Sequence, residues 1–331
     1  MYKILIIRFS SIGDIVLTTP VIRCLKTQLK NVEVHYLTKK KFVPVIENNP
    51  YIDKIYTIEK NTSEVTNALK KEKYTHIIDL HKNLRSMRIK LLLNKRSASY
   101  KKLNIKKWIT VNFKINQLPD VHIVDRYMDT INFLGVTNDG KGLDYFIPQK
   151  DIVPLTELPP SHQHGYIAFV IGAKHYTKQL PTEKIISICK KINQPIVLLG
   201  GKEDYEKAEH IINELKISHL TSHISHLPFN GCGKYNLNQS ASLIKQAKKV
   251  ITHDTGLMHI ASAFKKEIIS VWGSTVPEFG MYPYLLGENS KIVEVKNISC
   301  RPCSKIGYKK CPKKHFKCMM EIDENEFVFP S

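Results

Sequence analysis

The stretch KILIIRFSSIGDIVLTTP at residues 3–20 sets the pattern that the rest of the chain repeats. It begins with an apolar run at residues 4–7 and passes through a small-residue loop into an amphipathic segment at residues 14–29. This order is typical of a buried parallel strand followed by a helix. Because Pro20 lies inside the helical segment, we expect its first turns to be offset or kinked.

The same alternation continues along the chain. In the first half it predicts strands at residues 3–8, 32–37, 54–57 and 76–79, with helices between them. In the second half it predicts strands at residues 166–171, 196–199, 250–252 and 268–272, and helices at residues 182–192, 204–215, 241–248 and 256–264. We therefore predict an α/β protein with two doubly wound domains built on parallel sheets.

A stretch rich in Pro, Gly and Asp at residues 135–165 interrupts the alternation and carries one possible strand at residues 143–147. We interpret it as the linker between a domain at residues 1–150 and a domain at residues 151–331. The total length of 331 residues fits two domains of about 150 residues each.

The composition is that of a soluble globular protein, with 42% hydrophobic and 24% charged residues. The longest apolar runs are far shorter than the roughly 20 residues that cross a bilayer. The first residues lack the basic region, long apolar stretch and cleavage site of a signal peptide. We expect a cytoplasmic protein without a spanning helix.

The charge is strongly basic, with 50 Lys and Arg against 30 Asp and Glu, a formal net charge of +20. Residues 80–119 contain 11 basic side chains and no acidic one. Such a segment favours an anionic partner, for which nucleic acid, anionic lipid and an acidic glycan are candidates. A solvated basic surface is the alternative.

The loop after the first strand places Asp14 at the start of a helix. A carboxylate there is stabilised by exposed N–H groups, so Asp14 fits a helix cap. It also fits a general base, because it follows the carboxyl end of a strand.

Residues 4–20 resemble the opening of the bacterial lipopolysaccharide heptosyltransferases, glycosyltransferase family 9. The resemblance implies the GT-B fold, in which two Rossmann-like domains face each other across a cleft. It also implies inverting, metal-independent transfer of heptose from ADP-heptose to the inner core of lipopolysaccharide, without a cofactor. Asp14 matches the catalytic base of that family.

Residues 78–86, IDLHKNLRS, are similar to a second family segment, in which His81 replaces the usual Gln. This segment opens the basic stretch. We expect Lys82, Arg85 and Arg88 to bind an acidic acceptor in the N-terminal domain, because Arg meets phosphate or carboxylate with two hydrogen bonds. A helix surface without a ligand is the alternative for Arg85.

Residues 170–181 are similar to the family motif whose lysine, here Lys178, contacts the donor diphosphate. A lysine between strand and helix suits a departing diphosphate. Ala173 and Leu180 depart from the family pattern, in which a hydroxyl residue and a tryptophan are usual. These two departures indicate a donor pocket that differs in detail from the usual pocket of the family.

Two further segments resemble the nucleoside end of the family's donor site. Residues 198–204 offer Glu203 or Asp204 to ribose hydroxyls, although acids at a helix start are also ordinary caps. Residues 233–237 place Tyr235 where it could stack on adenine.

The densest match is THDTGLMHIASA at residues 252–263, where a carboxylate, a hydroxyl and a glycine open a helix. Helix N-termini of this kind bind anions. The resemblance implies donor binding by Asp254, Thr255, Gly256, Leu257 and His259. The loop at residues 272–277, which contains Thr275, resembles a family loop that borders the same cleft.

The C-terminal part carries four cysteines, Cys300, Cys303, Cys311 and Cys318. Their spacing is compatible with structural zinc, with a disulfide or with reduced thiols. The resemblance disfavours zinc, because many family members carry a similar tail without needing a metal, and we assign no metal site.

Together these features predict a glycosyltransferase with a nucleotide-sugar donor, a lipopolysaccharide acceptor and peripheral attachment to the anionic inner face of the cytoplasmic membrane. The same fold with another nucleotide-sugar is the alternative. A nucleic-acid-binding protein with a zinc ribbon is a more distant one, and we expect no nucleic-acid partner.

Overall fold

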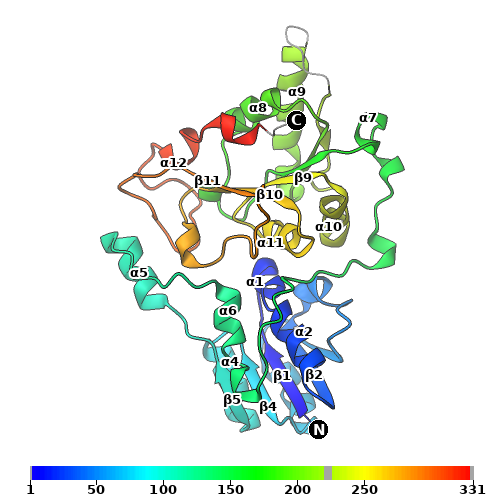
Figure 1. Ribbon diagram of the computed structural model, residues 1–331, viewed down its shortest axis with the longest axis vertical. Helices are drawn as coiled ribbons and strands as arrows, with labels where there is room; N and C mark the ends of the chain where they lie inside the picture. Colours follow the sequence, from blue (N-terminus) through cyan, green and yellow to red (C-terminus); the bar gives the residue numbers. More distant parts are fainter. Residues whose placement is uncertain (1, 220–225, 329–331) are drawn as a thin grey trace. The chain divides into compact units, whose positions relative to one another are not determined.

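A computed structural model describes residues 2–219 and 226–328. The chain forms two compact units (Figure 1). The first comprises Met1–Leu103 and Val121–Phe146, and the second comprises Asn104–Asp120 and Ile147–Ser331. Residues 104–120 therefore belong to the second unit although both flanking segments belong to the first.

The first unit is built on a sheet of five parallel strands in the order β3-β2-β1-β4-β5. The strands are β1 (Tyr2–Ile7), β2 (Val32–Lys39), β3 (Lys54–Ile58), β4 (His76–Asp79) and β5 (Arg96–Ser99). Residues 4–7 of the central strand β1 are fully buried. Burial on both faces explains why β1 reads as a continuous apolar run.

Five α-helices complete the first unit: α1 (Ile12–Val16), α2 (Thr19–Gln28), α3 (Ser63–Lys71), α4 (Leu84–Leu93) and α6 (Ile123–Met128). Short 3₁₀ turns lie at Lys40–Val45 and Asn132–Leu134. The single helix predicted at residues 14–29 is divided into α1 and α2, with Pro20 in the first turn of α2. Proline is tolerated there because the first helical N–H groups need no partner within the helix.

The second unit is built on six parallel strands in the order β11-β10-β9-β6-β7-β8. The strands are β6 (Ile167–Val170), β7 (Ile196–Leu199), β8 (Phe229–Asn230), β9 (Lys249–His253), β10 (Glu267–Trp272) and β11 (Lys291–Glu294). Two hydrophobic clusters pack on this sheet, one including Phe169 and Leu180 and the other including Tyr166 and Leu243.

The second unit contains α5 (Asn104–Phe113), α7 (Pro160–Gln163), α8 (Thr182–Lys191), α9 (Tyr205–His219), α10 (Leu237–Gln246), α11 (Gly256–Ala263) and α12 (Lys317–Met320). It also has 3₁₀ turns at Gln149–Asp151, Leu155–Glu157, Tyr176–Lys178, Lys202–Asp204, Pro277–Phe279 and Glu324–Phe327.

The predicted doubly wound architecture is confirmed, and each of the eight predicted strands is present. Strands β5, β8 and β11 were not predicted. All three lie at the edges of their sheets, β5 and β11 have little apolar character, and β8 has only two residues. The strand expected at residues 143–147 is wrong, since this described segment is irregular.

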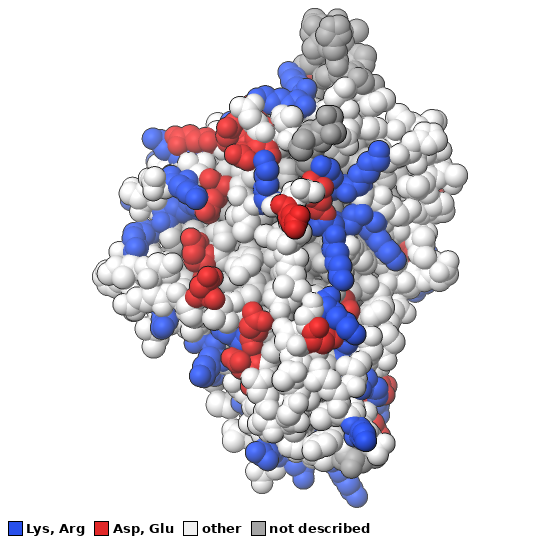
Figure 2. Space-filling model, in the orientation of Figure 1, with Lys and Arg blue, Asp and Glu red and all other residues white. Residues whose placement is uncertain are grey.

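Lys and Arg side chains are spread over the face shown in Figure 2, with Asp and Glu side chains among them. The basic stretch at residues 80–119 divides between the units, with residues 80–103 in the first and 104–119 in the second. Within the described residues, no helix has both the length and the apolarity that a membrane crossing requires.

Candidate functional site

The site in the first unit lies where the strand order reverses. Strand β2 lies on one side of β1 and β4 on the other, so the loops after β1 and β4 diverge at this point. Ligands of doubly wound sheets bind at such a switch point, beyond the carboxyl ends of the strands. The loop after β1 carries Asp14 and the loop after β4 carries His81 and Lys82.

Asp14 is held by both of its carboxylate oxygens. Oδ1 lies 2.6 Å from Nη2 of Arg8, and Oδ2 accepts hydrogen bonds from the Ser11 backbone N–H at 3.1 Å and from the Ser11 hydroxyl at 2.7 Å. Its side chain is 22% exposed. The geometry therefore combines a helix cap with an accessible, oriented carboxylate.

Arg8 joins the two loops of this switch point. The side chain is buried and donates to the carbonyl oxygens of Ser10, at 2.8 Å, and of Leu80, and to the Tyr127 hydroxyl at 2.9 Å. Burial lowers the pKa of Arg8, but the Asp14 carboxylate and nearby tyrosines outweigh it and raise the pKa above its usual value. Arg8 is thus a permanent positive charge beside Asp14. Arg8 lies within the motif at residues 3–20, but the sequence predicted no role for it.

His81 faces the same loop. Its ring makes an edge contact with Phe9, with the ring centroids 5.1 Å apart. Burial, and then the positive charges of Arg8 and Lys102, lower the pKa of His81 to about 4, so the ring is neutral at pH 7. Among the described residues, its buried Nδ1 atom has no hydrogen-bond partner. A buried polar atom without a partner is a place where a substrate hydroxyl can bind.

The predicted acceptor residues lie at the start of α4. Lys82, Arg85 and Arg88 are exposed, Lys82 in the loop and the two arginines on the helix. Buried Asp79 fixes this loop, because its Oδ1 accepts hydrogen bonds from the backbone N–H groups of His81, at 3.0 Å, and Lys82, at 2.7 Å. Asp79 also accepts a hydrogen bond from Ser86 at 2.8 Å. The fixed loop and the start of α4 therefore present three exposed cationic side chains.

The second unit has its own switch point, between β6 and β9. The loop after β6 carries Lys178 and the loop after β9 carries Asp254, and Nζ of Lys178 forms an ion pair with Oδ2 of Asp254. The same Oδ2 accepts a hydrogen bond from the Thr275 hydroxyl at 2.9 Å. Three predicted donor-binding residues from three loops therefore form one bonded cluster.

Helix α11 begins directly beside this cluster. Thr255 is its N-cap residue, Gly256 is its first residue, and the Thr255 hydroxyl lies 3.4 Å from the hydroxyl of Thr252. His259 is buried on α11, and Leu257 packs partly buried against the second hydrophobic cluster. The N–H groups of the first turn of α11 provide an anion-binding end next to Lys178.

Glu203 and Tyr235 lie on a different pair of loops, after β7 and β8. These loops are joined by a hydrogen bond of 3.2 Å from the Gly233 N–H to the Gly200 carbonyl. Glu203 is exposed and Tyr235 is half-buried. Asp204, the other acidic candidate, is buried and accepts a hydrogen bond from the Gly201 N–H at 2.8 Å. A Cβ atom at Gly172 or Gly200 would collide with the Asp204 side chain, so both glycines leave room for this carboxylate.

A segment that we call the tail loop, residues 299–310, supports the donor-site loops. Arg301 donates to the carbonyls of Gly273 at 2.6 Å and Thr275 at 3.0 Å, and it forms an ion pair of 2.5 Å with Glu294. The Thr177 hydroxyl accepts hydrogen bonds from the Ser274 hydroxyl and from the Tyr308 N–H, both at 2.8 Å. The tail loop thus fixes the neighbours of both Lys178 and Thr275. Arg301 is not among the residues predicted from the sequence, although its place between Cys300 and Cys303 is a signal.

The cysteines of the C-terminal part are free thiols. Sγ of Cys300 lies 3.7 Å from Nε2 of His315. Burial raises the pKa of Cys303 to about 12 and that of Cys318 to about 11, so both are protonated at pH 7. Across residues 2–219 and 226–328, no group of three or more His, Cys, Asp or Glu side chains is arranged to hold a metal ion.

Comparisons with known proteins agree with this architecture. The family model "Glycosyltransferase family 9 (heptosyltransferase)" matches residues 63–315. The chain is 25% identical over 295 residues to lipopolysaccharide heptosyltransferase 1 of Campylobacter coli, covering 82% of this chain and 84% of that protein. It is 24% identical over 314 residues to lipooligosaccharide heptosyltransferase 2 of Haemophilus influenzae, covering 84% and 85%.

Solved structures show the same fold. A glycosyl transferase family 9 structure from Veillonella parvula has a TM-score of 0.77 at 21% identity and covers 98% of this chain and 95% of that one. The structure of Escherichia coli ADP-heptose lps heptosyltransferase II has a TM-score of 0.71 at 17% identity and covers 98% and 96%. The predicted GT-B fold is therefore confirmed. With a family model matched over most of its length, the chain belongs to glycosyltransferase family 9 and is a glycosyltransferase.

Proposed function

We propose that this enzyme transfers heptose from ADP-heptose to the inner core of lipopolysaccharide, with inversion and without a metal. The observation that carries the proposal is the bonded cluster of Lys178, Asp254 and Thr275 at the start of α11. Membership of the heptosyltransferase family, and the similarity to lipopolysaccharide and lipooligosaccharide heptosyltransferases, support the sugar and the acceptor class.

In the proposed donor complex, the diphosphate of ADP-heptose lies at the first turn of α11. The N–H groups at Thr255 and Gly256 and the ammonium group of Lys178 neutralise its charge. The heptose hydroxyls donate to Asp254, which exchanges its ion pair with Lys178 for the sugar, and His259 borders the sugar or the diphosphate. Glu203 binds the ribose hydroxyls and Tyr235 stacks on adenine. As the bond to the diphosphate breaks, Lys178 stabilises the leaving ADP.

In the proposed transfer step, Asp14 takes the proton of an acceptor hydroxyl. The acceptor oxygen forms a bond to the anomeric carbon from the face opposite the diphosphate, and the bond from that carbon to the diphosphate oxygen breaks. Arg8 orients Asp14, because it holds one carboxylate oxygen and leaves the side chain partly exposed. The neutral His81 ring offers its unfilled Nδ1 atom to the acceptor.

The exposed cations at the start of α4 suit a phosphorylated or carboxylated acceptor. Lys82, Arg85 and Arg88 are proposed to bind the acidic groups of the inner core. Because such an acceptor is lipid-anchored, we place the enzyme on the inner face of the cytoplasmic membrane, attached peripherally. The basic composition of residues 80–119 supports this location.

A second candidate is the same reaction with another nucleotide-sugar. Leu180 is 1% exposed and belongs to the hydrophobic core, where the family pattern has tryptophan, and Ala173 lacks the usual hydroxyl. Both departures lie beside the proposed diphosphate position. The nucleic-acid-binding alternative receives no support from the family match.

Mass spectrometry tests the proposal directly. Lipopolysaccharide truncated before its heptoses is incubated with the enzyme and ADP-heptose, and in parallel with ADP-glucose or a UDP-sugar. We expect the mass of one heptose to be added only with ADP-heptose. Transfer from another donor supports the second candidate, and no transfer from any donor overturns both.

A further inference from the structure

Helix α5 exposes a cluster of apolar side chains. Ile105, Trp108 and Phe113 are 76%, 50% and 59% exposed, and we call these three residues the α5 face. The rings of Trp108 and Phe113 make an edge contact, with their centroids 5.4 Å apart. A grouped aliphatic and aromatic surface of this kind marks an interaction site.

The opposite side of α5 is fixed to the second unit. Thr110, about 140° around the helix from Ile105 at 3.6 residues per turn, is buried. Nζ of Lys107 lies 5.1 Å from the centre of the Phe279 ring. Just after the helix, Nζ of Lys114 donates to the carbonyls of Cys300, at 3.1 Å, and Pro302, at 2.7 Å. Ile105 and Trp108 are therefore held away from the surface on which the helix packs, while Phe113, about 60° around the helix from Thr110, lies at the margin of that surface.

The tail loop adds a second exposed apolar element beside α5. Nζ of Lys305 donates to the carbonyl of Asn104, the first residue of α5, at 3.0 Å. The next residues, Ile306 and Tyr308, are 63% and 43% exposed. Two segments separated by about 200 positions in sequence thus contribute to one neighbourhood.

Both segments are free of acidic residues. Residues 80–119 contain none, and residues 295–320 contain eight basic residues and no acid. Lys106 on α5 and Lys305, Lys309 and Lys310 on the tail loop are exposed. Glu278, an acid of the same unit, instead lines the cavity on the inner side of α5. Exposed aromatic residues bordered by lysines are the composition of a helix that lies in a membrane interface.

We propose that the α5 face, with Ile306 and Tyr308, inserts into the headgroup region of an anionic bilayer while the surrounding lysines bind its phosphates. In Figure 2 the left edge, where Figure 1 places α5, is largely uncharged and has Lys or Arg side chains beside it. This inference deepens the proposed function, since the partner is the membrane that carries the acceptor. The proposed function explains the attraction of the enzyme to the membrane by charge alone. The present inference adds the insertion of named apolar side chains.

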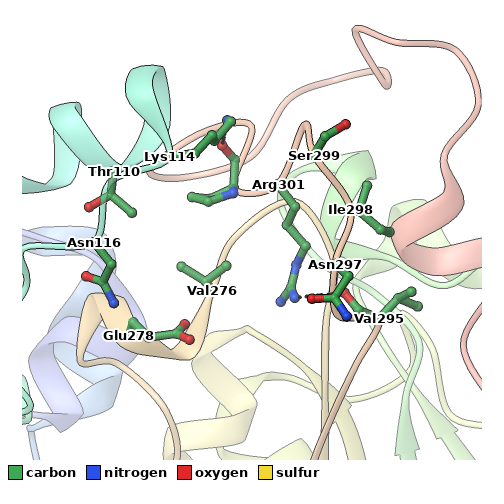
Figure 3. A pocket seen from close by; sticks show the side chains of 11 residues that line it. Thr110, Lys114, Asn116, Val276, Glu278, Val295, Asn297, Ile298, Ser299 and Arg301 are labelled. Carbon is green, nitrogen blue, oxygen red and sulfur yellow. Dashed lines mark hydrogen bonds between the residues drawn. The ribbon is translucent and has the colours of Figure 1, made fainter.

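The inner side of α5 connects this surface to the donor site. A cavity of about 580 Å³ is lined by Thr110, Lys114 and Asn116 on one side and by Val276, Glu278 and Arg301 among others on the rest (Figure 3). Val276 directly follows Thr275 of the donor cluster. A bilayer held by α5 therefore brings lipid-anchored acceptors next to the loop that follows Thr275.

The chain contains a built-in probe of insertion. It has only two tryptophans, Trp108 on the α5 face and Trp272, which is 1% exposed in β10. We expect the fluorescence of the full-length protein to shift to the blue on adding vesicles of phosphatidylcholine and phosphatidylglycerol. Lipids brominated on their acyl chains should quench it, because Trp108 then lies at the depth of the bromines. Unchanged emission with bound vesicles overturns insertion.

Serine substitutions separate apolar insertion from charge. Ile105→Ser, Trp108→Ser and Phe113→Ser together should reduce vesicle flotation about tenfold at physiological salt, because the lysines alone are screened there. Ile152→Ser with Ile217→Ser, two exposed residues that are 46% and 64% accessible elsewhere in the second unit, is the matched control and should float like the wild type. Equal flotation of all three proteins overturns the proposal.

Two further readouts identify the source of any failure. If the triple variant instead changes the sedimentation of the free protein, the α5 face joins two copies of the chain and the membrane proposal is wrong. Transfer to a delipidated core oligosaccharide should be equal in the triple variant and the wild type. If vesicles bind as expected but neither protein transfers heptose, the proposed function fails and the docking surface stands.

Discussion

Nη2 of Arg8 lies 2.6 Å from Oδ1 of Asp14, while the Ser11 hydroxyl and N–H hold Oδ2. One carboxylate oxygen is therefore oriented by a buried cation from the end of β1, and the other by the start of α1. Efficient proton transfer requires a base that is already oriented toward the proton. A carboxylate fixed in this manner meets that requirement.

Replacing Asp14 with Asn tests the assignment of the base. We expect Asp14→Asn to lower the transfer rate by about 10² to 10⁴ and to leave ADP affinity nearly unchanged, because the carboxylate serves the acceptor proton. The matched control is Ser11→Ala, which removes the cap contact and keeps the carboxylate. If Asp14 were only a helix cap, both variants would lose similar stability and similar activity in paired melting and rate measurements.

Lys178→Ala tests the donor site. Loss of a charge-assisted contact to the diphosphate should weaken ADP binding by about 1–3 kcal/mol in calorimetry. Thr255→Val, at the N-cap of α11, should also weaken it. Lys184→Ala is the control, since Lys184 pairs with Glu324 elsewhere in the same unit. If both Lys178→Ala and Thr255→Val bound ADP as tightly as the wild type, the donor site would have to lie elsewhere.

Arg301 should matter for donor binding although it is proposed to touch no substrate. Removing the buried partner of Glu294 in Arg301→Ala should cost about 3–5 kcal/mol of unfolding free energy. Arg301→Lys keeps the charge but cannot reach both the Gly273 and Thr275 carbonyls. We expect Arg301→Lys to stay folded in a urea titration and still bind ADP more weakly. Full ADP affinity in this variant would show that the tail loop does not set the position of Thr275.

Acceptor recognition should depend on the cations of α4. Arg85→Ala with Arg88→Ala should raise the KM for the lipopolysaccharide acceptor severalfold, in a salt-dependent manner, without changing ADP affinity. Lys70→Ala with Lys71→Ala, in the last turn of α3, removes two charges from the same unit as a control. If the two double variants had the same KM for the acceptor, Arg85 and Arg88 would be solvated surface residues that do not bind the acceptor.

The free energy of unfolding should decrease at acidic pH because of His253. Burial, and then the charge of Lys207, lower the pKa of fully buried His253 to about 3. Between pH 6.5 and 3 the unfolded chain binds a proton at this residue that the folded chain does not, so the unfolding free energy decreases as the pH falls.

The size of this effect can be measured by substitution. At pH 5, His253 alone should lower the unfolding free energy by about 2 kcal/mol relative to pH 7, from an unfolded pKa near 6.5. His253→Gln should therefore show a shallower pH dependence in urea unfolding than the wild type. The same slope in both proteins would mean that His253 is protonated at pH 5 in the folded protein.

The sequence predicted the strands well because central parallel strands such as β1 and β9 are continuous apolar runs bounded by loops. The resemblance to glycosyltransferase family 9 brought Lys178, Asp254 and Thr275 into one predicted donor site, and all three follow strands of the second sheet. The sequence did not show Arg8 or Arg301 as positioning residues. Arg8 joins Asp14 to the Leu80 carbonyl, 72 positions away, and Arg301 binds the Gly273 and Thr275 carbonyls, 28 and 26 positions away. The alternation of strands and helices in the sequence also could not assign residues 104–120 to the second unit. That assignment depends on contacts between residues nearly 190 positions apart.

The chain passes between its two units at three points, around residues 103, 120 and 146. During synthesis, α5 leaves the ribosome long before the carbonyls of Cys300 and Pro302 that bind Lys114 exist. At about 5–20 residues per second, the 188 residues between Lys114 and Pro302 take about 10–40 s to synthesise. Helix α5, which exposes Ile105, Trp108 and Phe113, is thus synthesised well before its partner in the tail loop. This delay gives a nascent chain time to meet a lipid surface before its second unit has folded.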